Sequence, residues 1–413
     1  MTAMENNTSS QTNGPASPNS AHTTRIARRD FLRACALAGA GLASDSHRKL
    51  ANAMLSWPVG GKAPTGNIQV GLDIGSSKVC AAVGELLADG TIKILGIGQA
   101  PSRGVTAHGI VDGEAASACV SAALVDAEIQ CDVMIRNVVL AVPGTEIFNY
   151  ETTDYYIDLD QSEWKELFEW EKICYAASPD GSIQPVTLAD HKHARHWSIV
   201  FGPDERRIQD SIRCVEDVGV QVERIVFAPA ASSEAVLSAN QKKLGALVID
   251  IGGGTTDLAI YYNGALVLSV CVPVGGRHIA NELALTLGIP LAEAERLKIM
   301  ESTRRRDAIP DEGFLRKQRE MIHAIVQYRL EEIFDRVKRR LASFCDGIDS
   351  LCAGVHLIGG CALDAGICEV AEKVLGLPAQ RACAKGLSGP ARFLANPGLA
   401  CALGLAKLGH TEC

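Results

Sequence analysis

Two short segments combine residue types that suit phosphate and cation binding. The first is 71–78, Gly-Leu-Asp-Ile-Gly-Ser-Ser-Lys, and the second is 248–257, Val-Ile-Asp-Ile-Gly-Gly-Gly-Thr-Thr-Asp. In each, an apolar run containing an Asp leads through a Gly/Ser/Thr turn into a second apolar run, a pattern that predicts a β-hairpin. Glycines let a turn approach a ligand closely, and hydroxyls and bare N–H groups suit phosphate oxygens.

Each predicted hairpin carries one Asp at its strand end, Asp73 in the first and Asp250 in the second. We expect both carboxylates to hold Mg²⁺ through its water molecules. Ordinary turn chemistry, which also favours Asp and Gly, is the alternative. Two such hairpins far apart in one chain predict a duplicated fold that holds a nucleotide from both sides. The expected phosphate contacts come from Gly75, Ser76, Ser77, Lys78, Gly252, Gly253, Gly254, Thr255 and Thr256. Lys78 could instead be a solvated strand residue.

The composition is that of a soluble globular protein with more than one domain. The chain has 413 residues, of which 47% are hydrophobic and 21% charged, and its net charge is -8. This acidic balance, without a basic stripe carrying interleaved aromatic residues, argues against nucleic-acid binding. The 14 cysteines include no Cys-x-x-Cys pair and no zinc spacing, which predicts reduced thiols in the core. Cys361 is the one cysteine beside a predicted ligand loop and the candidate for reactivity.

Residues 1–66 differ from the rest of the chain. Residues 1–24 are rich in Asn, Ser, Thr, Pro and Gly, a composition typical of disorder. The segment 28–33, Arg-Arg-Asp-Phe-Leu-Arg, precedes an apolar stretch over 34–43, which matches a twin-arginine export signal in outline but is too short to span a bilayer. Export conflicts with an ATP site, so we favour two other interpretations: translation starting near Met54, or a basic interfacial anchor.

The rest of the chain mixes strands and helices, which predicts an α/β protein with two lobes and a cleft. Residues 148–200 read as irregular. The expected strands are 68–83, 84–87, 91–97, 137–142, 220–227 and 355–358, and the expected helices are 114–128, 204–218, 230–240, 279–287, 291–300 and 314–344.

Three segments together resemble the ATPase superfamily of actin, sugar kinases and heat-shock chaperones. Segments 73–75 and 250–257 and the pair Gly359-Gly360 are similar, in this order, to its first phosphate loop, second phosphate loop and adenosine loop. The resemblance implies duplicated ribonuclease-H-like domains that bind ATP and Mg²⁺ in the cleft. It also implies that Glu234, on the helix ahead of the second loop, orients the attacking water, so Glu234 and Asp250 are the catalytic candidates. A plain turn is the alternative for the glycine pair.

Further segments resemble the bacterial cell-division actin homologue FtsA. They are 70–79, 101–104, 109–112, 292–298, 329–334 and 375–378, and the resemblance covers roughly 68–148 and 204–409. It implies an adaptor that binds the FtsZ C-terminal tail, self-associates into actin-like filaments and works in the cytoplasm, at mid-cell on the inner face of the membrane. Glu295 and Lys298, one helical turn apart, would touch ribose and adenine, although a surface ion pair is nearly as good an interpretation.

The resemblance also predicts the domain boundaries. They are 1–66 for the N-terminal extension, 67–147 for the first part of the first lobe, 148–202 for a shortened insertion similar to the family's 1C subdomain, 203–243 for the return to the first lobe, 244–409 for the second lobe and 410–413 for the tail. Two regions depart from the family pattern, the insertion and the 301–321 stretch, which lacks a Pro/Gly-rich hairpin. The sequence has no C-terminal amphipathic helix after Gly409, so we leave membrane association open.

These departures keep two alternatives alongside the adaptor. One is a degenerate FtsA paralogue with a regulatory role, and the other is an ATPase or kinase of the same fold with its own substrate. A kinase needs a catalytic base and an acceptor pocket, and the sequence indicates neither. We expect ATP binding with slow or negligible hydrolysis.

Overall fold

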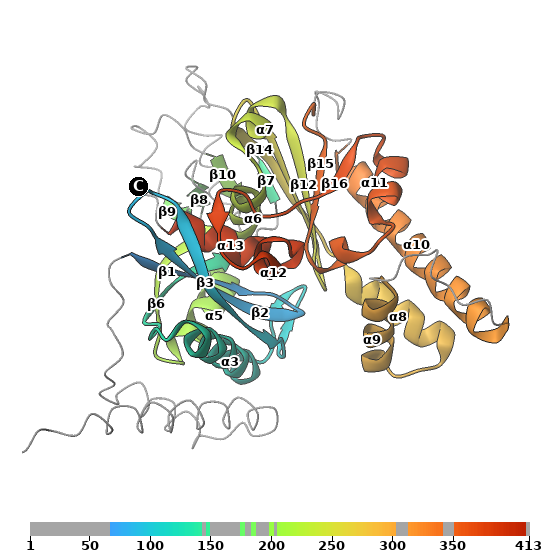
Figure 1. Cartoon of the computed structure of the whole chain (residues 1–413), viewed down its shortest axis with the longest axis horizontal. Helices are drawn as coiled ribbons and strands as arrows, with labels where there is room; N and C mark the ends of the chain where they lie inside the picture. The colour runs from blue at the N-terminus through green and yellow to red at the C-terminus, as the bar shows by residue number, and fades with distance from the viewer. Residues whose placement is uncertain are drawn as a thin grey trace, which may run out of the picture.

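The computed structural model describes residues 67–142, 146–148, 174–177, 183–186, 198–201, 205–302, 313–341 and 351–409. Two large mixed sheets with helices packed against them form two lobes (Figure 1). The first sheet has the strand order β11 (Gln221–Phe227), β6 (Asn137–Val142), β1 (Ile68–Ile74), β2 (Lys78–Leu86), β3 (Ile92–Pro101) and β17 (Leu387–Ser388). The second has the order β16 (Ala379–Arg381), β15 (Val355–Ile358), β12 (Ala246–Ile251), β13 (Thr256–Tyr262), β14 (Ala265–Val272), β7 (Glu146–Phe148), β10 (Ser198–Phe201), β8 (Cys174–Ala177) and β9 (Ile183–Val186).

The two sheets repeat one pattern of strands. In each, two antiparallel hairpins, β1-β2-β3 or β12-β13-β14, are extended on the side of the first strand by parallel neighbours, β6 and β11 or β15 and β16. Parallel neighbours need crossover connections, and helices supply them. The predicted duplication of the fold is therefore present in the strand order.

The helices that cover the sheets follow the predicted pattern. They are α3 (Gly113–Cys131), α5 (Glu205–Glu216), α6 (Ala228–Val236), α7 (Ala239–Leu244), α8 (Gly276–Leu287), α9 (Leu291–Ser302), α10 (Gly313–Leu341), α11 (Ile367–Leu375), α12 (Ala391–Leu394) and α13 (Ala400–Leu408), with 3-10 turns η4 (Gly360–Leu363) and η5 (Pro397–Leu399) and a small ribbon of β4 (Val105–Thr106) and β5 (Gly109–Ile110). None of the helices described combines the length and apolarity needed to cross a bilayer.

Helix α3 shows how the local sequence sets an element. Asp112 caps it by accepting a hydrogen bond from the backbone N–H of Ala115 at 3.1 Å, which satisfies one of the free donors of the first turn. Its buried face is rich in alanine, so the helix lies close to the first sheet. At Gly98 of β3 a Cβ would clash with the carbonyl oxygen of Ala123, and only glycine allows this approach.

Helices α6 and α13 pack together between the lobes, and both contact the first sheet. A Cβ at Gly404 of α13 would overlap the carbonyl oxygen of Ala231 in α6, and one at Gly71 of β1 would overlap Leu405. Strand β17 pairs with β3 of the first sheet. The predicted second lobe, 244–409, thus includes two elements that pack on the first sheet, since β17 pairs with β3 and α13 contacts β1 and β2.

Most of the predicted elements are confirmed, including both hairpins, the strand 355–358 and the long helix near 314–344. Residues 148–200 are not wholly irregular, because three short strands, β8, β9 and β10, extend the second sheet there. The expected strands 68–83 and 84–87 are instead β1 and β2, separated by the turn of the first hairpin. The expected helix 230–240 is two helices: α6 ends at Val236, and Ser238 caps α7 through the N–H of Gln241. The N-terminal extension and the tail 410–413 lie outside the described residues.

Candidate functional site

The two hairpin turns are built in the same way. The N–H of Gly75 donates to the carbonyl of Lys78 at 3.0 Å, and the N–H of Gly252 donates to the carbonyl of Thr255 at 2.9 Å. The turns also approach each other, since a Cβ at Gly253 would lie 2.8 Å from the Cβ of Ser77. Two Gly/Ser/Thr loops from different lobes thus face one another.

Between these loops lies a cavity of about 360 Å³. Its lining includes apolar side chains from α8 to α10 as well as the polar loops, a combination typical of a small-molecule site. Of the residues predicted from the sequence, those that line the cavity are Asp73, Gly75, Ser76, Ser77, Lys78, Asp250, Gly252, Gly253, Thr255, Glu295, Lys298, Gly359 and Gly360.

Three of the carboxylates that line this cavity belong to the two hairpins, Asp73, Asp250 and Asp257. Burial raises the pKa of Asp73 to about 6, against the opposing charge of Lys78. Burial, followed by the charges of Asp257 and Asp73, raises the pKa of Asp250 to about 7. Burial also raises the pKa of Asp257 to about 6, despite a hydrogen bond from Thr255 at 3.1 Å. Without a cation, these carboxylates carry more negative charge than their surroundings stabilise.

The three carboxylates fit a cation that is held through water. Oδ1 of Asp257 is buried and has no hydrogen-bond partner among the described residues. The described part of the chain also holds no group of three or more His, Cys, Asp or Glu side chains placed to bind a metal directly. A hydrated Mg²⁺ needs acceptors at the distance of its water shell instead, and buried carboxylate oxygens around a cavity supply them.

Asp250 is held in place by the elements around it. The hydroxyl of Ser232 on α6 donates to Asp250 Oδ2 at 3.2 Å. Gly359, with φ of +87°, brings the turn after β15 so close that a Cβ there would overlap Asp250 Oδ1. This position therefore requires glycine for both its backbone angle and its space. The same turn continues into η4, which lines another side of the cavity.

The far side of the cavity is formed by α8, α9 and η4. Lys298 Nζ donates to Glu295 Oε1 at 2.7 Å and to the carbonyl of Gly276 at 2.9 Å. The two predicted residues are thus both an ion pair and part of the cavity wall, with Lys298 buried. Cys361 lies beside them, and burial raises its pKa to about 11, so it is a neutral thiol at physiological pH rather than a reactive thiolate.

Three predicted site residues do not line the cavity. The Thr256 side chain is fully buried, and its hydroxyl donates to the carbonyl of Val274 at 2.8 Å. Gly254 instead backs onto the first loop, where a Cβ would lie 2.9 Å from Ser76 Oγ. The alternation of side chains along a strand explains why Thr256 does not line the cavity. It is the first residue of β13, and its side chain points to the opposite face of the sheet from that of Asp257.

Glu234 is the third, and the structure does not place this predicted catalytic residue in the cavity lining. It forms ion pairs with Lys242 and, at 3.0 Å, with Lys407. Burial tends to raise its pKa, but the hydrogen bonds and charges of the two lysines outweigh burial and hold the pKa below its ordinary value. The α6 residue that lines the cavity is Ala228, at the other end of the helix, and its methyl group cannot orient water.

The sequence interpretation gave no role to three residues at the site. Asp257 was part of the quoted motif, and its register opposite Asp250 in the β12–β13 hairpin could have indicated it. Arg207 of α5 lines the cavity, and Arg277 of α8 donates to the carbonyl of Ser76 at 2.8 Å, joining the second lobe to the first loop. Nothing in the local sequence marks these two arginines, because each contacts a residue far away in the chain. Arg207 bonds to the carbonyl of His108, 99 residues away, and Arg277 bonds to the carbonyl of Ser76, 201 residues away.

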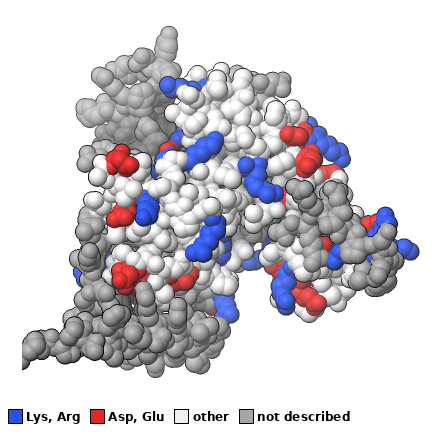
Figure 2. Space-filling model, viewed as in Figure 1, with Lys and Arg blue, Asp and Glu red and all other residues white. Residues whose placement is uncertain are grey.

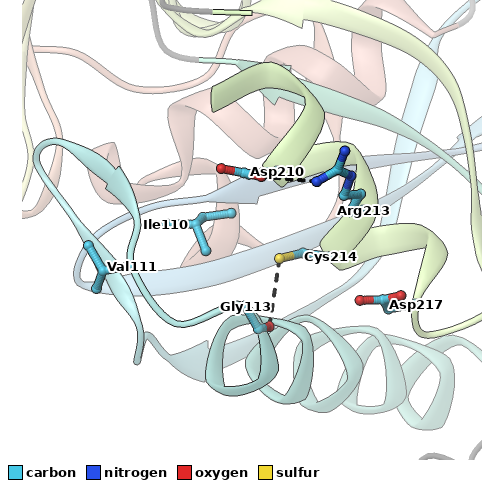
Figure 3. A pocket seen from close by; sticks show the side chains of 7 residues that line it. All are labelled: Ile110, Val111, Gly113, Asp210, Arg213, Cys214 and Asp217. Atoms are coloured by element: carbon cyan, nitrogen blue, oxygen red, sulfur yellow. Dashed lines mark hydrogen bonds and ion pairs between the residues drawn. The ribbon is translucent and has the colours of Figure 1, made fainter. Parts of the chain in front are cut away.

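A second, smaller pocket of about 200 Å³ lies where α5 meets β5 and the start of α3 (Figure 3). Its charged side chains are two acids and one base, with Arg213 3.7 Å from Asp210, and Cys214 Sγ contacts the carbonyl of Gly113 at 3.8 Å. No predicted site residue lines it. The larger cavity between the lobes is therefore the candidate site.

Comparison with known proteins agrees with this architecture. A sequence profile of the family described as "Cell division protein FtsA" matches residues 247–404. The Cell division protein FtsA of Neisseria meningitidis serogroup B is 31% identical over an alignment of 373 positions that covers 83% of this chain and 89% of that protein. That of Escherichia coli K12 is 27% identical over 387 residues, covering 84% of this chain and 91% of that protein.

Solved structures show the same fold. A chain of the PilM-PilN type IV pilus biogenesis complex has a TM-score of 0.62 at 15% identity, covering 83% of this chain and 99% of that chain. The ethanolamine utilization protein EutJ from Carboxydothermus hydrogenoformans has a TM-score of 0.51 at 19% identity, covering 83% and 90%. The two-lobed actin-like fold predicted from the sequence is confirmed. With a relative above 30% identity matched over most of its length, the chain belongs to the FtsA family of cell division proteins.

Proposed function

We propose that this chain binds ATP with Mg²⁺ between its lobes and acts as an adaptor for FtsZ at the division site. One observation carries the nucleotide part: two Gly/Ser/Thr loops from different lobes meet at one cavity, and three partly buried carboxylates with raised pKa values, Asp73, Asp250 and Asp257, line it. Membership of the FtsA family supports the division role.

In this proposal the backbone N–H groups of the two loops and the side chains of Ser76, Ser77, Lys78 and Thr255 contact the phosphates. Asp73, Asp250 and Asp257 accept hydrogen bonds from water on Mg²⁺, which neutralises phosphate charge when bound. Glu295 and Lys298 contact the nucleoside, and the glycines at 359 and 360 let backbone approach it. ATP then acts mainly as a conformational ligand that favours the closed arrangement of the lobes.

We propose that hydrolysis is slow or negligible. Phosphoryl transfer to water needs a group that positions the water, and the described part of α6 offers Ala228 at the cavity. The acidic residue of the same helix, Glu234, is engaged by two lysines. This arrangement also supports the second candidate, a family member that binds nucleotide and regulates another division protein.

The proposed FtsZ contact lies on α8 and α9. Leu285 near the end of α8 is 80% exposed, and Leu291 and Met300 of α9 are also exposed. Exposed apolar side chains on neighbouring helices suit a short peptide that buries its own apolar residues. We further propose that the chain self-associates into actin-like filaments and lies at mid-cell on the inner face of the membrane, as we expect of a member of this family.

Two measurements test the proposal. Titration calorimetry of the full chain with ATP should give Mg²⁺-dependent binding, and absence of heat with either ATP or ADP would remove the nucleotide site. Fluorescence anisotropy with a labelled FtsZ tail peptide from the same organism should give binding that weakens in Leu285→Ser and Leu291→Ser. No binding at millimolar protein and low salt would leave the regulatory candidate, and rapid phosphate release would instead favour the ATPase alternative.

A further inference from the structure

Elements far apart in the chain meet on one surface of the molecule. The loop before β17 is tied to α6 through the N–H of Lys385 and the carbonyl of Ala235 at 2.7 Å, and to α12 through the N–H of Ala384 and the carbonyl of Leu394 at 3.0 Å. Lys385 Nζ also donates to Gln241 of α7 at 2.7 Å. These elements and α13 carry a set of basic side chains that we call the basic face: Lys242, Lys243, Lys385, Arg392 and Lys407.

The basic face has almost no compensating negative charge. The segments that supply it, 235–249 and 382–409, contain no Asp or Glu at all. The carboxylate that pairs with it is Glu234, between Lys242 and Lys407, so five basic groups against one acid leave a net charge of +4. The whole chain has a net charge of -8, so this concentration of positive charge is a local feature.

Three of the five basic side chains are exposed, and Lys242 and Lys407 are partly buried beside Glu234. The exposed three are Lys243, Lys385 and Arg392. Figure 2 shows Lys and Arg without adjacent Asp or Glu over the centre of this view, where α6, α7, α12 and α13 lie in Figure 1. Leu244, next to Lys243 at the end of α7, is 57% exposed. None of the five basic residues lines the cavity between the lobes, so occupancy of the cavity leaves this surface free.

We propose that the basic face binds an anionic phospholipid bilayer. Lysine and arginine side chains spread over several elements suit the many phosphodiester groups of a membrane surface, which attract basic residues without requiring a fixed geometry. The exposed Leu244 adds an apolar side chain that reaches the acyl boundary beside the charges. The contact comes from folded elements and requires no spanning helix. It rests on the proposed place at the inner face of the membrane, to which it adds a contact surface, and it does not depend on nucleotide or FtsZ binding.

Co-sedimentation of the full chain with vesicles tests this proposal. Vesicles of phosphatidylcholine with about 30% phosphatidylglycerol provide the anionic surface, and pure phosphatidylcholine provides the neutral one. One variant combines Lys243→Gln, Lys385→Gln and Arg392→Gln. At low salt each lost charge should weaken partitioning about fivefold, so the triple variant should bind about 100-fold more weakly. Binding of the unaltered chain should also fall as salt is raised.

A matched control removes the same charge from another part of the molecule. Arg336→Gln, Arg339→Gln and Arg340→Gln lie on the exposed end of α10 and should leave partitioning within a few-fold of the unaltered chain.

Equal losses in the control and the test variant would overturn the proposal, because they would show only a net-charge effect. Unchanged binding in the test variant would assign attachment to another segment, and equal binding to neutral vesicles would exclude headgroup recognition. If the unaltered chain bound poly-glutamate but not the anionic vesicles, the basic face would belong to an acidic protein partner instead.

Discussion

Asp250→Asn should stabilise the protein without nucleotide and yet weaken nucleotide binding. The carboxylate has an ordinary pKa of 3.8 and a pKa of about 7 in the folded chain, because burial and two neighbouring carboxylates disfavour its charge. A raised carboxyl pKa means that the folded state binds the proton more tightly than the unfolded state. The ionised group therefore costs stability, beginning as the pH rises past 3.8 and fully above about pH 7.

The magnitude follows from the shift. About three pKa units correspond to at most about 4 kcal/mol, since each unit is worth about 1.4 kcal/mol. Asp250 is only partly buried and faces a cavity that admits water, which reduces the cost. We therefore expect the neutral amide to raise the free energy of unfolding by about 1–2 kcal/mol at pH 8 and to change it little at pH 4.

The same substitution removes an acceptor for the cation's water shell. We expect the affinity for Mg·ATP to fall at least about tenfold. Urea denaturation at pH 8 should at the same time show a higher free energy of unfolding for the nucleotide-free variant. Asp89→Asn is the control, because Asp89 is exposed and hydrogen bonds from Thr91 lower its pKa; it should give no such gain. If Asp250→Asn is less stable at pH 8, the carboxylate has a structural role that outweighs its burial. Unchanged Mg·ATP affinity would refute the assignment of the loop.

Four further outcomes are expected. Mg·ATP binding should release up to about one proton at pH 6.5 and almost none at pH 8.5, because the cation keeps the carboxylates with raised pKa values ionised. Calorimetry in buffers of different ionisation enthalpy measures this release. Arg277→Gln should weaken ATP binding several-fold without loss of melting temperature, since it removes the hydrogen bond from α8 to the carbonyl of Ser76 in the first loop. Glu234→Gln should leave phosphate release unchanged but destabilise the fold, because it leaves two lysines with a neutral partner. Gly404→Val should lower the free energy of unfolding by at least about 3 kcal/mol or prevent folding, because the side chain would overlap the carbonyl of Ala231. Gly113→Ala is the control for the same thermal denaturation and should fold normally, because a Cβ there meets no other atom.

The sequence predicted the elements of the site better than it predicted the side chains that act there. Asp-Gly hairpins have strong local signals, because a strand period changes to a turn that needs glycine. Both hairpins, and the glycine pair after a buried strand, were located from these signals. The local pattern does not say which residues of a hairpin face a cavity, so Thr256 was included and Asp257 was given no role.

Contacts between distant segments were harder to predict. Glu234 lies on the expected helix, but the two lysines that engage it are 8 and 173 residues further along the chain. The basic face likewise draws on two separate segments, and neither one reads as a basic stripe by itself. The return of 387–409 to the first lobe depends on glycines whose lack of a side chain permits close packing, and single glycines have many explanations in a sequence.

The duplicated hairpins are equal in backbone and unequal in charge, and this inequality bears on how the lobes work together. In the first hairpin, Asp73 pairs across the strands with the neutral Cys80, and Lys78 follows the turn. In the second, Asp250 pairs with another carboxylate, Asp257. The second lobe therefore brings an excess of negative charge to the cavity, and the first lobe brings one acid, Asp73, and two bases, Lys78 and Arg207. A cation near the second loop and phosphate oxygens near Lys78 would balance both lobes at once, and neither lobe can supply that balance alone. For this reason we expect Mg²⁺ and nucleotide to bind cooperatively and to favour the closed arrangement, with each ligand weak in the absence of the other.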